Sequence, residues 1–349
     1  MKPSKLLIIP IVLAVGFCTT NLLGQKNVRT SVVAFYNLEN LYDTINDLSI
    51  NDEEFLPNSA KNWNTKRYQT KLENLSGVIA KLGHDEDVTG PAVIGVSEVE
   101  NLAVLKDLTT QPALKPFDYQ IVHFDSPDKR GIDVALLYQP KYFKVTNARA
   151  FPLMIYDEET KERIYTRDML VVSGLFDGEP MHFIVNHWPS RRGGKDNSYL
   201  RITAAQRCRH LVDSISQTAQ NAKVIVMGDL NDDPTDASVI KYMNATGNIK
   251  SVKSGKMYNS MEPLFKNGIG TLAYRGQWNL FDQFLLTEPL VSKRTKGYKL
   301  QKARVFNEAF LIRDEGQYKG YPLRTFGGND YLGGYSDHLP VYVVLVKEE

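Results

Sequence analysis

The chain has little cysteine. Only Cys18 and Cys208 occur among its 349 residues, and Cys18 lies in an N-terminal segment that we expect to be removed. The remaining protein then holds a single thiol, so it forms no internal disulfide even in an oxidising compartment. Its stability must come from an apolar core, for which a hydrophobic content of 42% is ample.

The N-terminal apolar run is too short for a comfortable membrane span. Two lysines precede apolar residues 6–17 and polar residues follow them, whereas a span needs about 20 apolar residues. This order is typical of a secretory signal peptide. We expect residues 1–24 to be cleaved and the mature protein to be secreted or periplasmic. Lipid anchoring at Cys18 is the alternative, but Phe17 is bulky where lipoprotein signals usually carry a small residue.

The chain also lacks an excess of charge of either sign. The formal net charge is +2, and it falls to about zero once Lys2 and Lys5 leave with the signal peptide. This balance excludes a globally basic nucleic-acid-binding protein. There is no internal repeat, low-complexity tract or linker rich in proline or glycine, so we expect one domain over residues 25–349.

The apolar pattern predicts an α/β fold. A first strand is expected over residues 31–36. Apolar residues then recur every three or four positions from Tyr68, which predicts an amphipathic helix capped by Thr65 and ending near Gly83. A second helix is expected over residues 202–215. Many strands and few helices indicate stacked sheets with helices outside, and the further expected strands are 93–96, 134–138, 170–175, 182–186, 224–227, 281–287 and 341–346.

Polar clusters stand at the ends of two apolar runs. Asp229 and Asn231 follow the expected strand 224–227, and Asp337 and His338 precede the last strand. Charges at the ends of buried strands are expensive unless chemistry or a metal needs them there. An acid and an amide two residues apart can face one phosphate, the acid activating a water and the amide donating to an oxyanion. We interpret both clusters as parts of one active site.

Glu98 follows Ser97 at the end of another expected strand. A carboxylate there suits a hard cation such as Mg²⁺, and a surface glutamate is the alternative. Ser97 does not form the nucleophile elbow of a serine hydrolase, because Val99 stands where glycine is required. An EF-hand around Asp229 is also disfavoured, because Pro234 replaces the required glycine.

Two of the six histidines, His187 and His338, lie beside expected strands in a polar context. A lone histidine is more often structural than catalytic, and that is our interpretation of the other four. Asp282 interrupts an apolar strand. A carboxylate that orients a histidine would explain this placement.

Six short motifs occur in a definite order along the chain: Tyr36-Asn37-Leu38-Glu39-Asn40, Ser97-Glu98-Val99, Asn186-His187, Gly228-Asp229-Leu230-Asn231, Phe281-Asp282-Gln283 and Ser336-Asp337-His338. The ordered set resembles the endonuclease/exonuclease/phosphatase superfamily, the fold group of deoxyribonuclease I. The resemblance covers nearly the whole mature chain. It implies a DNase I-like, four-layered α/β sandwich with two packed mixed β-sheets flanked by helices.

The resemblance also implies roles for these residues. Glu98 would be the principal metal ligand, with Asn37 and Asp337 nearby, for Mg²⁺ or in its place Mn²⁺ or Ca²⁺. The reaction would be hydrolysis of a phosphate ester by in-line attack of activated water. Either Asp229 or an Asp282–His338 pair would act as the base. The expected catalytic residues are His187, Asp229, Asn231, Asp282 and His338.

Substrate contacts are expected from basic and aromatic residues. Arg167 stands where deoxyribonuclease I has a phosphate-contacting arginine, the alternative being a surface salt bridge to Asp168 or Glu162. Arg191 and Arg192 follow His187 and can grip successive phosphates, while Trp188 can stack a base. A buried loop anchor is an equally good interpretation of Trp188.

Three functions remain open, in order of preference. The first is a secreted metal-dependent nuclease that acts on DNA or RNA, with nucleic acid as its binding partner. The second is a phosphatase or a phosphodiesterase of phospholipid or inositol phosphate, although residues 228–231 lack the neighbouring aromatic and arginine typical of inositol phosphatases. The third is a non-catalytic binding protein. No obligate protein partner is indicated.

Overall fold

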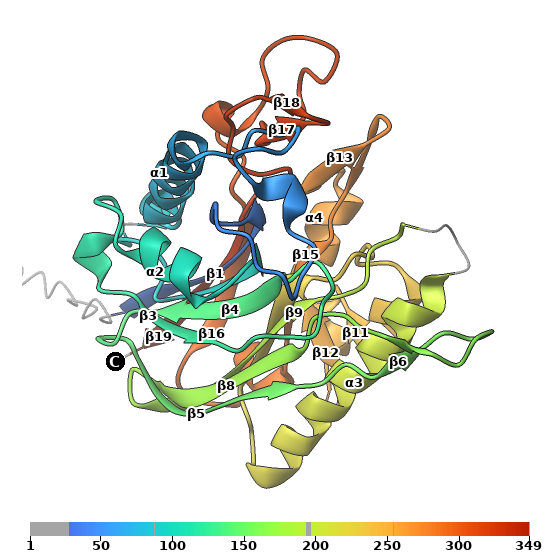
Figure 1. Cartoon of the computed structure of the whole chain (residues 1–349). Helices are drawn as coiled ribbons and strands as arrows, with labels where there is room; N and C mark the ends of the chain where they lie inside the picture. The colour runs from blue at the N-terminus through green and yellow to red at the C-terminus, as the bar shows by residue number, and fades with distance from the viewer. Residues whose placement is uncertain (1–27, 87, 193–196, 254, 349) are drawn as a thin grey trace, which may run out of the picture.

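Two large mixed β-sheets lie face to face in the computed structural model, which describes residues 28–86, 88–192, 197–253 and 255–348 (Figure 1). Sheet A has the strand order β16-β19-β1-β2-β4-β3. These strands are β16 (Lys299–Val305), β19 (Val341–Glu348), β1 (Val28–Leu41), β2 (Val93–Val99), β4 (Asp133–Tyr138) and β3 (Gln120–His123). Sheet B has the order β11-β12-β15-β10-β9-β8-β5. Its strands are β11 (Ala245–Thr246), β12 (Met257–Asn259), β15 (Asp282–Leu286), β10 (Val224–Asp229), β9 (Glu179–His187), β8 (Met169–Phe176) and β5 (Phe143–Phe151).

Alternating residues of each central strand explain the layers. In β1, Val33 and Phe35 face the core between the two sheets, while Val32 and Ala34 face a second core. Helices α1 (Thr65–Lys81) and α2 (Leu102–Thr109) cover that second core, and α3 (Ser198–Thr218) covers the outer face of sheet B. Because side chains on a strand point alternately to its two faces, apolar residues at consecutive positions require cover on both sides. The expected four-layered sandwich is therefore confirmed.

The N-cap of helix α1 lies one residue before the expected one. The Asn64 side chain accepts a hydrogen bond from the Arg67 amide, so Asn64 and not Thr65 is the N-cap. Asparagine is a strong N-cap residue because its short side chain reaches the unpaired amides of the first turn. The helix ends at Lys81, close to the expected end near Gly83.

The sequence pattern missed two long strands. β5 and β16 carry mostly half-buried or exposed residues and lie at the free edges of their sheets, so they show no continuous apolar run. Small ribbons are formed by β6 (Ile155–Tyr156) with β7 (Arg163–Ile164), β13 (Leu272–Tyr274) with β14 (Gln277–Asn279), and β17 (Phe326–Gly327) with β18 (Asp330–Tyr331). Short helices are α4 (Glu262–Lys266), η1 (Glu53–Phe55), η2 (His84–Glu86), η3 (Lys115–Phe117), η5 (Ser238–Tyr242), η6 (Ile249–Ser251), η7 (Glu288–Leu290) and η8 (Ala309–Leu311).

The expected signal peptide, residues 1–24, and Cys18 lie outside the described residues. Within the described part of the chain, no helix combines the length and the apolar character needed to cross a membrane.

Strand pairing brings the motif residues to one end of both sheets. β10 runs parallel to β9 and antiparallel to β15, so Asp229 pairs with His187 on one side and with Asp282 on the other. In sheet A, β1 runs parallel to β2, and Asn37 pairs with Ser97 next to Glu98. Segments far apart in sequence therefore meet through register alone.

Gly228 permits the close approach of β9 and β10. A Cβ atom at this position would lie 2.2 Å from the Asn186 carbonyl oxygen, a distance that no side chain tolerates. The glycine of the Gly228-Asp229-Leu230-Asn231 motif thus serves packing, and the acid that follows it is set at the strand end.

Candidate active site

Asp229 lies at the centre of the polar cluster. Its Oδ2 accepts a hydrogen bond from Asn37 Nδ2 at 3.1 Å and lies 3.6 Å from His187 Nε2 and 3.8 Å from His338 Nε2. Its Oδ1 accepts the Asn231 amide at 2.9 Å. Burial raises the pKa of Asp229 to about 7, although the nearby His338 opposes the shift. One carboxylate thus contacts four of the residues expected to form the site.

His338 and Asp282 form a buried pair. His338 Nδ1 lies 2.7 Å from Asp282 Oδ2, which orients the ring so that Nε2 faces Asp229. Burial disfavours the charged imidazolium, but Asp282 and Asp229 outweigh it and raise the pKa of His338 well above its ordinary value. The second oxygen of Asp282, Oδ1, is buried without a hydrogen-bond partner in the described part of the chain.

His187 has the opposite character. Burial, reinforced by Arg167 and Arg130, lowers its pKa well below the ordinary value. Its Nε2 lies 3.8 Å from Glu98 Oε1, and its Nδ1 is buried without a described hydrogen-bond partner. The pKa values of the two histidines of the site are therefore shifted in opposite directions.

Backbone strain gathers at the same strand ends. Glu39, Asn40, Glu98 and Asn231 all have positive φ, between 48° and 58°. This left-handed conformation is uncommon for residues other than glycine and recurs at functional sites, where the surrounding structure holds it. In Glu98 it turns the side chain so that Oε2 accepts the Asn40 amide at 3.0 Å.

The donor set fits a divalent cation. Atoms of Asp229, Asp282 and His338 that could ligate a metal lie within 4.8 Å of one another, and the Glu98 carboxylate lies beside them through His187. Asn37 contributes an amide oxygen that accepts the Glu39 amide. Carboxylate and amide oxygens are what hard cations prefer, and the buried Asp282 Oδ1 has no hydrogen-bond partner among the described residues.

Asp337 is drawn toward Arg324 instead of this cluster. Arg324 Nη2 donates to Asp337 Oδ2 at 2.9 Å. Burial works against ionisation, but Arg324 and His338 keep the pKa of Asp337 below its ordinary value. Asp337 as a metal ligand stays a prediction.

Two residues expected to contact the substrate are buried. Arg167 is only 6% exposed and donates to the carbonyl oxygens of His187 and Trp188 and to Asp128. These bonds hold the end of β9 and replace the expected salt bridge to Asp168 or Glu162, and a contact of Arg167 with a phosphate stays a prediction. Trp188 is fully buried, with its indole nitrogen donating to Asn186 Oδ1 at 3.1 Å. The loop-anchor interpretation of Trp188 is the one that the structure supports.

Arg191 and Arg192 have different environments. Arg191 is engaged within the protein, where its guanidinium donates to the Asn231 carbonyl oxygen, forms ion pairs with Asp232, Asp233 and Asp236, and lies 4.5 Å from the Phe281 ring centre. A contact of Arg191 with a phosphate would have to compete with these ion pairs and stays a prediction. Arg192 is exposed and lines a cavity beside the site, so a role in substrate binding stays a prediction for it.

A buried ion network was missed by the sequence analysis. Arg324 Nε donates to Glu39 at 2.9 Å, and Lys71 Nζ, which is buried, lies 3.8 Å from the same carboxylate. Glu39 also accepts the Thr325 amide at 2.7 Å. Lys71 lies on the apolar face of α1 between Tyr68 and Leu75, and a lysine on such a face is the signal that could have revealed it.

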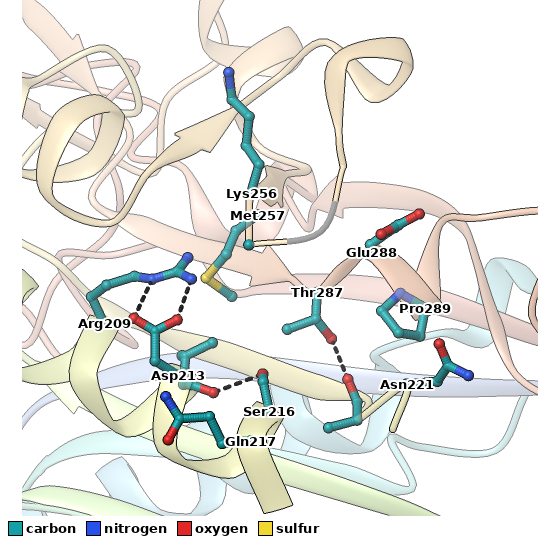
Figure 2. A pocket seen from close by; sticks show the side chains of 13 residues that line it. Arg209, Asp213, Ser216, Gln217, Asn221, Lys256, Met257, Thr287, Glu288 and Pro289 are labelled. Atoms are coloured by element: carbon teal, nitrogen blue, oxygen red, sulfur yellow. Dashed lines mark hydrogen bonds and ion pairs between the residues drawn. The ribbon is translucent and has the colours of Figure 1, made fainter. Parts of the chain in front are cut away.

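Two cavities share Arg324 of this network. One, of about 630 Å³, is lined by the cations Lys61, Arg130, Arg192 and Arg324 together with Glu39, Glu53 and Glu54. The other, of about 750 Å³, includes Arg324 and Asp337 and is described further below. A third pocket, lined by Arg209, Asp213 and Thr287, lies at the opposite ends of β10 and β15 (Figure 2). It is remote from the acids and histidines of the site.

A two-sheet sandwich with carboxylates and histidines gathered at its strand ends defines a phosphate-ester hydrolase. The chain belongs to the Endonuclease/Exonuclease/phosphatase family, whose profile matches residues 32–347. No curated protein matches the sequence.

Solved structures with this fold have little sequence identity to the chain. A Bacteroides thetaiotaomicron endonuclease/exonuclease/phosphatase family protein is 18% identical, with a TM-score of 0.55, covering 93% of this chain and 97% of its own. D. rerio TDP2 complexed with a single-strand DNA product is 16% identical, with a TM-score of 0.51 and coverages of 90% and 98%. A mannosyl-6-phosphatase from Bacteroides thetaiotaomicron is 18% identical, with a TM-score of 0.53 and coverages of 90% and 99%. At these identities the likeness concerns the fold.

Proposed function

We propose that this protein is a secreted, metal-dependent phosphodiesterase that acts on nucleic acid. The observation that carries the proposal is the position of Arg324, which lines two cavities near the site, one with Arg130 and Arg192 and one that reaches Asp337 beside His338. A phosphodiester carries two substituents on the reacting phosphate, whereas a monoester carries only one. Two neighbouring cavities that both contain arginines therefore favour a diester. The DNA product bound to TDP2 is compatible with this choice.

The chain's own residues would perform the proton transfers. Asp229 Oδ2 lies within 4 Å of both imidazoles, so we propose Asp229 as the base that takes the proton of the attacking water. His338, oriented by Asp282 at Nδ1, presents Nε2 to stabilise or protonate the departing oxygen. Asn231 lies beside Asp229 but gives its side-chain amide to the Trp188 carbonyl oxygen. Its proposed contact with the phosphate requires that bond to open.

Glu98 and Asn37 would hold a divalent cation, for which Mg²⁺ is our proposal. A bound cation of this kind supplies a Lewis acid that stabilises charge on phosphoryl oxygens. Glu98 is only partly buried, with 14% of its side chain exposed, which keeps the carboxylate accessible from the cleft.

The proposal is tested with three substrates offered to the same preparation. These are supercoiled plasmid, the small diester bis(p-nitrophenyl) phosphate and the monoester p-nitrophenyl phosphate. We expect Mg²⁺-dependent nicking and hydrolysis of the small diester, both abolished by EDTA and by Asp229→Ala. The monoester should react slowly. Asp213→Ala, in the remote pocket of Figure 2, is the control that should keep full activity.

The other two functions give different results. Release of inorganic phosphate from the monoester without cleavage of either diester would support a phosphatase. No turnover of any substrate would leave a binding protein. The proposal of secretion is separate, and N-terminal sequencing of the protein from the medium or periplasm would support it only if the mature chain starts near residue 25.

A further inference from the structure

A cavity beside the catalytic residues is lined by tyrosines and arginines to which the proposed proton transfers assign no role. It lies between the β13–β14 hairpin and residues 313–322, and it reaches Arg324 and Asp337 next to His338. Its volume of about 750 Å³ is sufficient for a nucleotide-sized group. The hairpin and the β17–β18 ribbon both lie at the upper end of the molecule in Figure 1.

Three tyrosines line this cavity. Tyr274 and Tyr318 are 62% and 48% exposed, and Tyr321 lies beside Tyr318 with ring centres 5.6 Å apart. Large aromatic side chains are usually buried, so three that gather in one open cavity indicate a binding surface. Flat rings left open to solvent offer faces on which a base can stack.

The two rims of the cavity are tied together before any ligand arrives. The Gly276 amide donates to Tyr321 Oη at 2.6 Å, which joins the hairpin tip to the opposite segment. That segment is itself closed by hydrogen bonds between Arg313 and residues 320–321. Side chains held in place lose less entropy on binding, and such preorganisation increases affinity.

The hairpin tip contains an arginine where a smaller residue would be favoured. Arg275 and Gly276 have φ values of 49° and 81°, as in the two-residue turns that prefer asparagine, aspartate or glycine. The guanidinium of Arg275 lies 5.2 Å from the Tyr274 ring centre and lines the cavity. A strained arginine at this position is explained if its charge is used.

We propose that this tyrosine cavity is a subsite for single-stranded nucleic acid. One or two bases stack on Tyr274 and Tyr318, and Arg275 and Arg313 contact the phosphates between them. The inference rests on the proposed function, because it places one side of the cleaved strand. Sugar rings also stack on tyrosine, but a neutral sugar gives no use to the arginines. An anionic chain with planar bases uses both.

The test measures binding separately from cleavage. Fluorescence anisotropy gives the Kd of a labelled single-stranded DNA octamer in an Asp229→Ala background that leaves it intact. We expect the Tyr274→Ala, Tyr318→Ala double variant to raise Kd about ten- to hundredfold, since stacking is worth that much per base or two. Tyr318→Phe keeps the ring and should retain affinity. Tyr156→Ala removes a tyrosine that is 51% exposed in another part of the chain and should have no effect.

An abasic octamer makes the test specific for stacking. The double variant should bind it no more weakly than the Asp229→Ala parent does. An unchanged Kd for the ordinary octamer would overturn the proposal, as would an equal loss on the abasic octamer. The same tyrosine substitutions can be made in a protein that retains Asp229. Loss of sugar-phosphate hydrolysis there, with an unchanged Kd for the octamer, would overturn the proposal in favour of a carbohydrate ligand.

Failure of the subsite and failure of the proposed function are distinguishable. Hydrolysis of bis(p-nitrophenyl) phosphate by the wild-type protein tests the function, and the Kd of the octamer in the Asp229→Ala background tests the subsite. A wild-type protein that hydrolyses no diester would refute the function, and tyrosine-dependent binding of the octamer would still support the subsite.

Discussion

His338 Nδ1 lies 2.7 Å from Asp282 Oδ2, and both side chains are buried at the meeting point of the two sheets. Asp282 starts β15 and His338 precedes β19, so each sheet contributes one partner. The pair fixes which ring nitrogen faces Asp229. A change of one atom in Asp282 should therefore affect catalysis more than folding.

Asp282→Asn should lower turnover of a phosphodiester by about 10²- to 10⁴-fold, as for other positioned proton-transfer groups. The melting temperature should stay near that of the wild type, because the asparagine oxygen can still accept the hydrogen of His338 Nδ1 and the buried unpartnered carboxylate oxygen is replaced by a neutral group. Steady-state kinetics and thermal melts measure both. Asp213→Asn, at the other end of the sheet, is the matched control, and turnover unchanged in Asp282→Asn would exclude the pair from catalysis.

Glu98→Gln should raise the Mg²⁺ concentration needed for half-maximal activity. The amide keeps the size of the side chain and can accept the Asn40 amide, but it loses the charge that attracts a cation. A second measurement does not depend on activity: Mg²⁺ should raise the melting temperature of the wild type and not of the variant. Glu100→Gln changes a neighbouring acid that accepts the Asp43 amide and should respond to Mg²⁺ like the wild type.

Substitution of Arg191 should affect the stability of the protein, whereas substitution of Arg192 should affect DNA binding. Arg191→Ala removes a guanidinium that is paired with three aspartates and should lower the free energy of unfolding by about 2 kcal/mol. Arg192→Ala should leave it unchanged but weaken DNA binding and reduce the salt dependence by about one counterion. Urea denaturation and DNA binding at several salt concentrations test this. The reverse assignment would contradict the structure.

Lys71→Met should destabilise the protein by about 1–3 kcal/mol, because a buried carboxylate loses one of its charged neighbours. Glu39 lies 3.8 Å from Lys71 Nζ and keeps its bonds to Arg324 and to the Thr325 amide in the variant. Adding Glu39→Gln should recover part of the loss. Denaturation of the single and double variants in urea measures the coupling, and strictly additive effects would show that the two residues do not interact.

Cys208 should resist thiol reagents in the native protein. Burial raises its pKa to about 12, and the thiolate is the reactive form. Because the folded pKa is above that of the unfolded chain, the thiol contributes stability below about pH 9 that is lost as the pH rises toward 12. Reaction of residues 25–349 with Ellman's reagent should therefore stay slow up to pH 9 and become fast in denaturant. Fast labelling of the native protein would contradict the burial.

The architecture could be predicted from the sequence because strands that are buried on both faces consist of consecutive apolar residues. Consecutive apolar residues in the central strands and the spacing from Tyr68 along α1 follow from the periods of strand and helix. The polar strand ends could also be predicted, since Asp229 and His338 stand at the ends of apolar runs and Asp282 interrupts one. β5 and β16 could not be, because an edge strand with polar residues resembles a loop.

The residue types of the chain already indicate which side chains can hold a cation, transfer a proton or pack between two sheets. How each of them is used depends on its partners in the folded protein. Two adjacent arginines cannot be told apart in the sequence. In the structure, Arg191 forms ion pairs with three aspartates, while Arg192 is exposed. Likewise, Arg324 belongs to none of the sequence motifs. In the folded protein it binds Glu39, which also lies near the buried Lys71, and it lines two cavities. A charge acquires its role from the partners that long-range packing brings to it, and spacing along the chain does not record those partners.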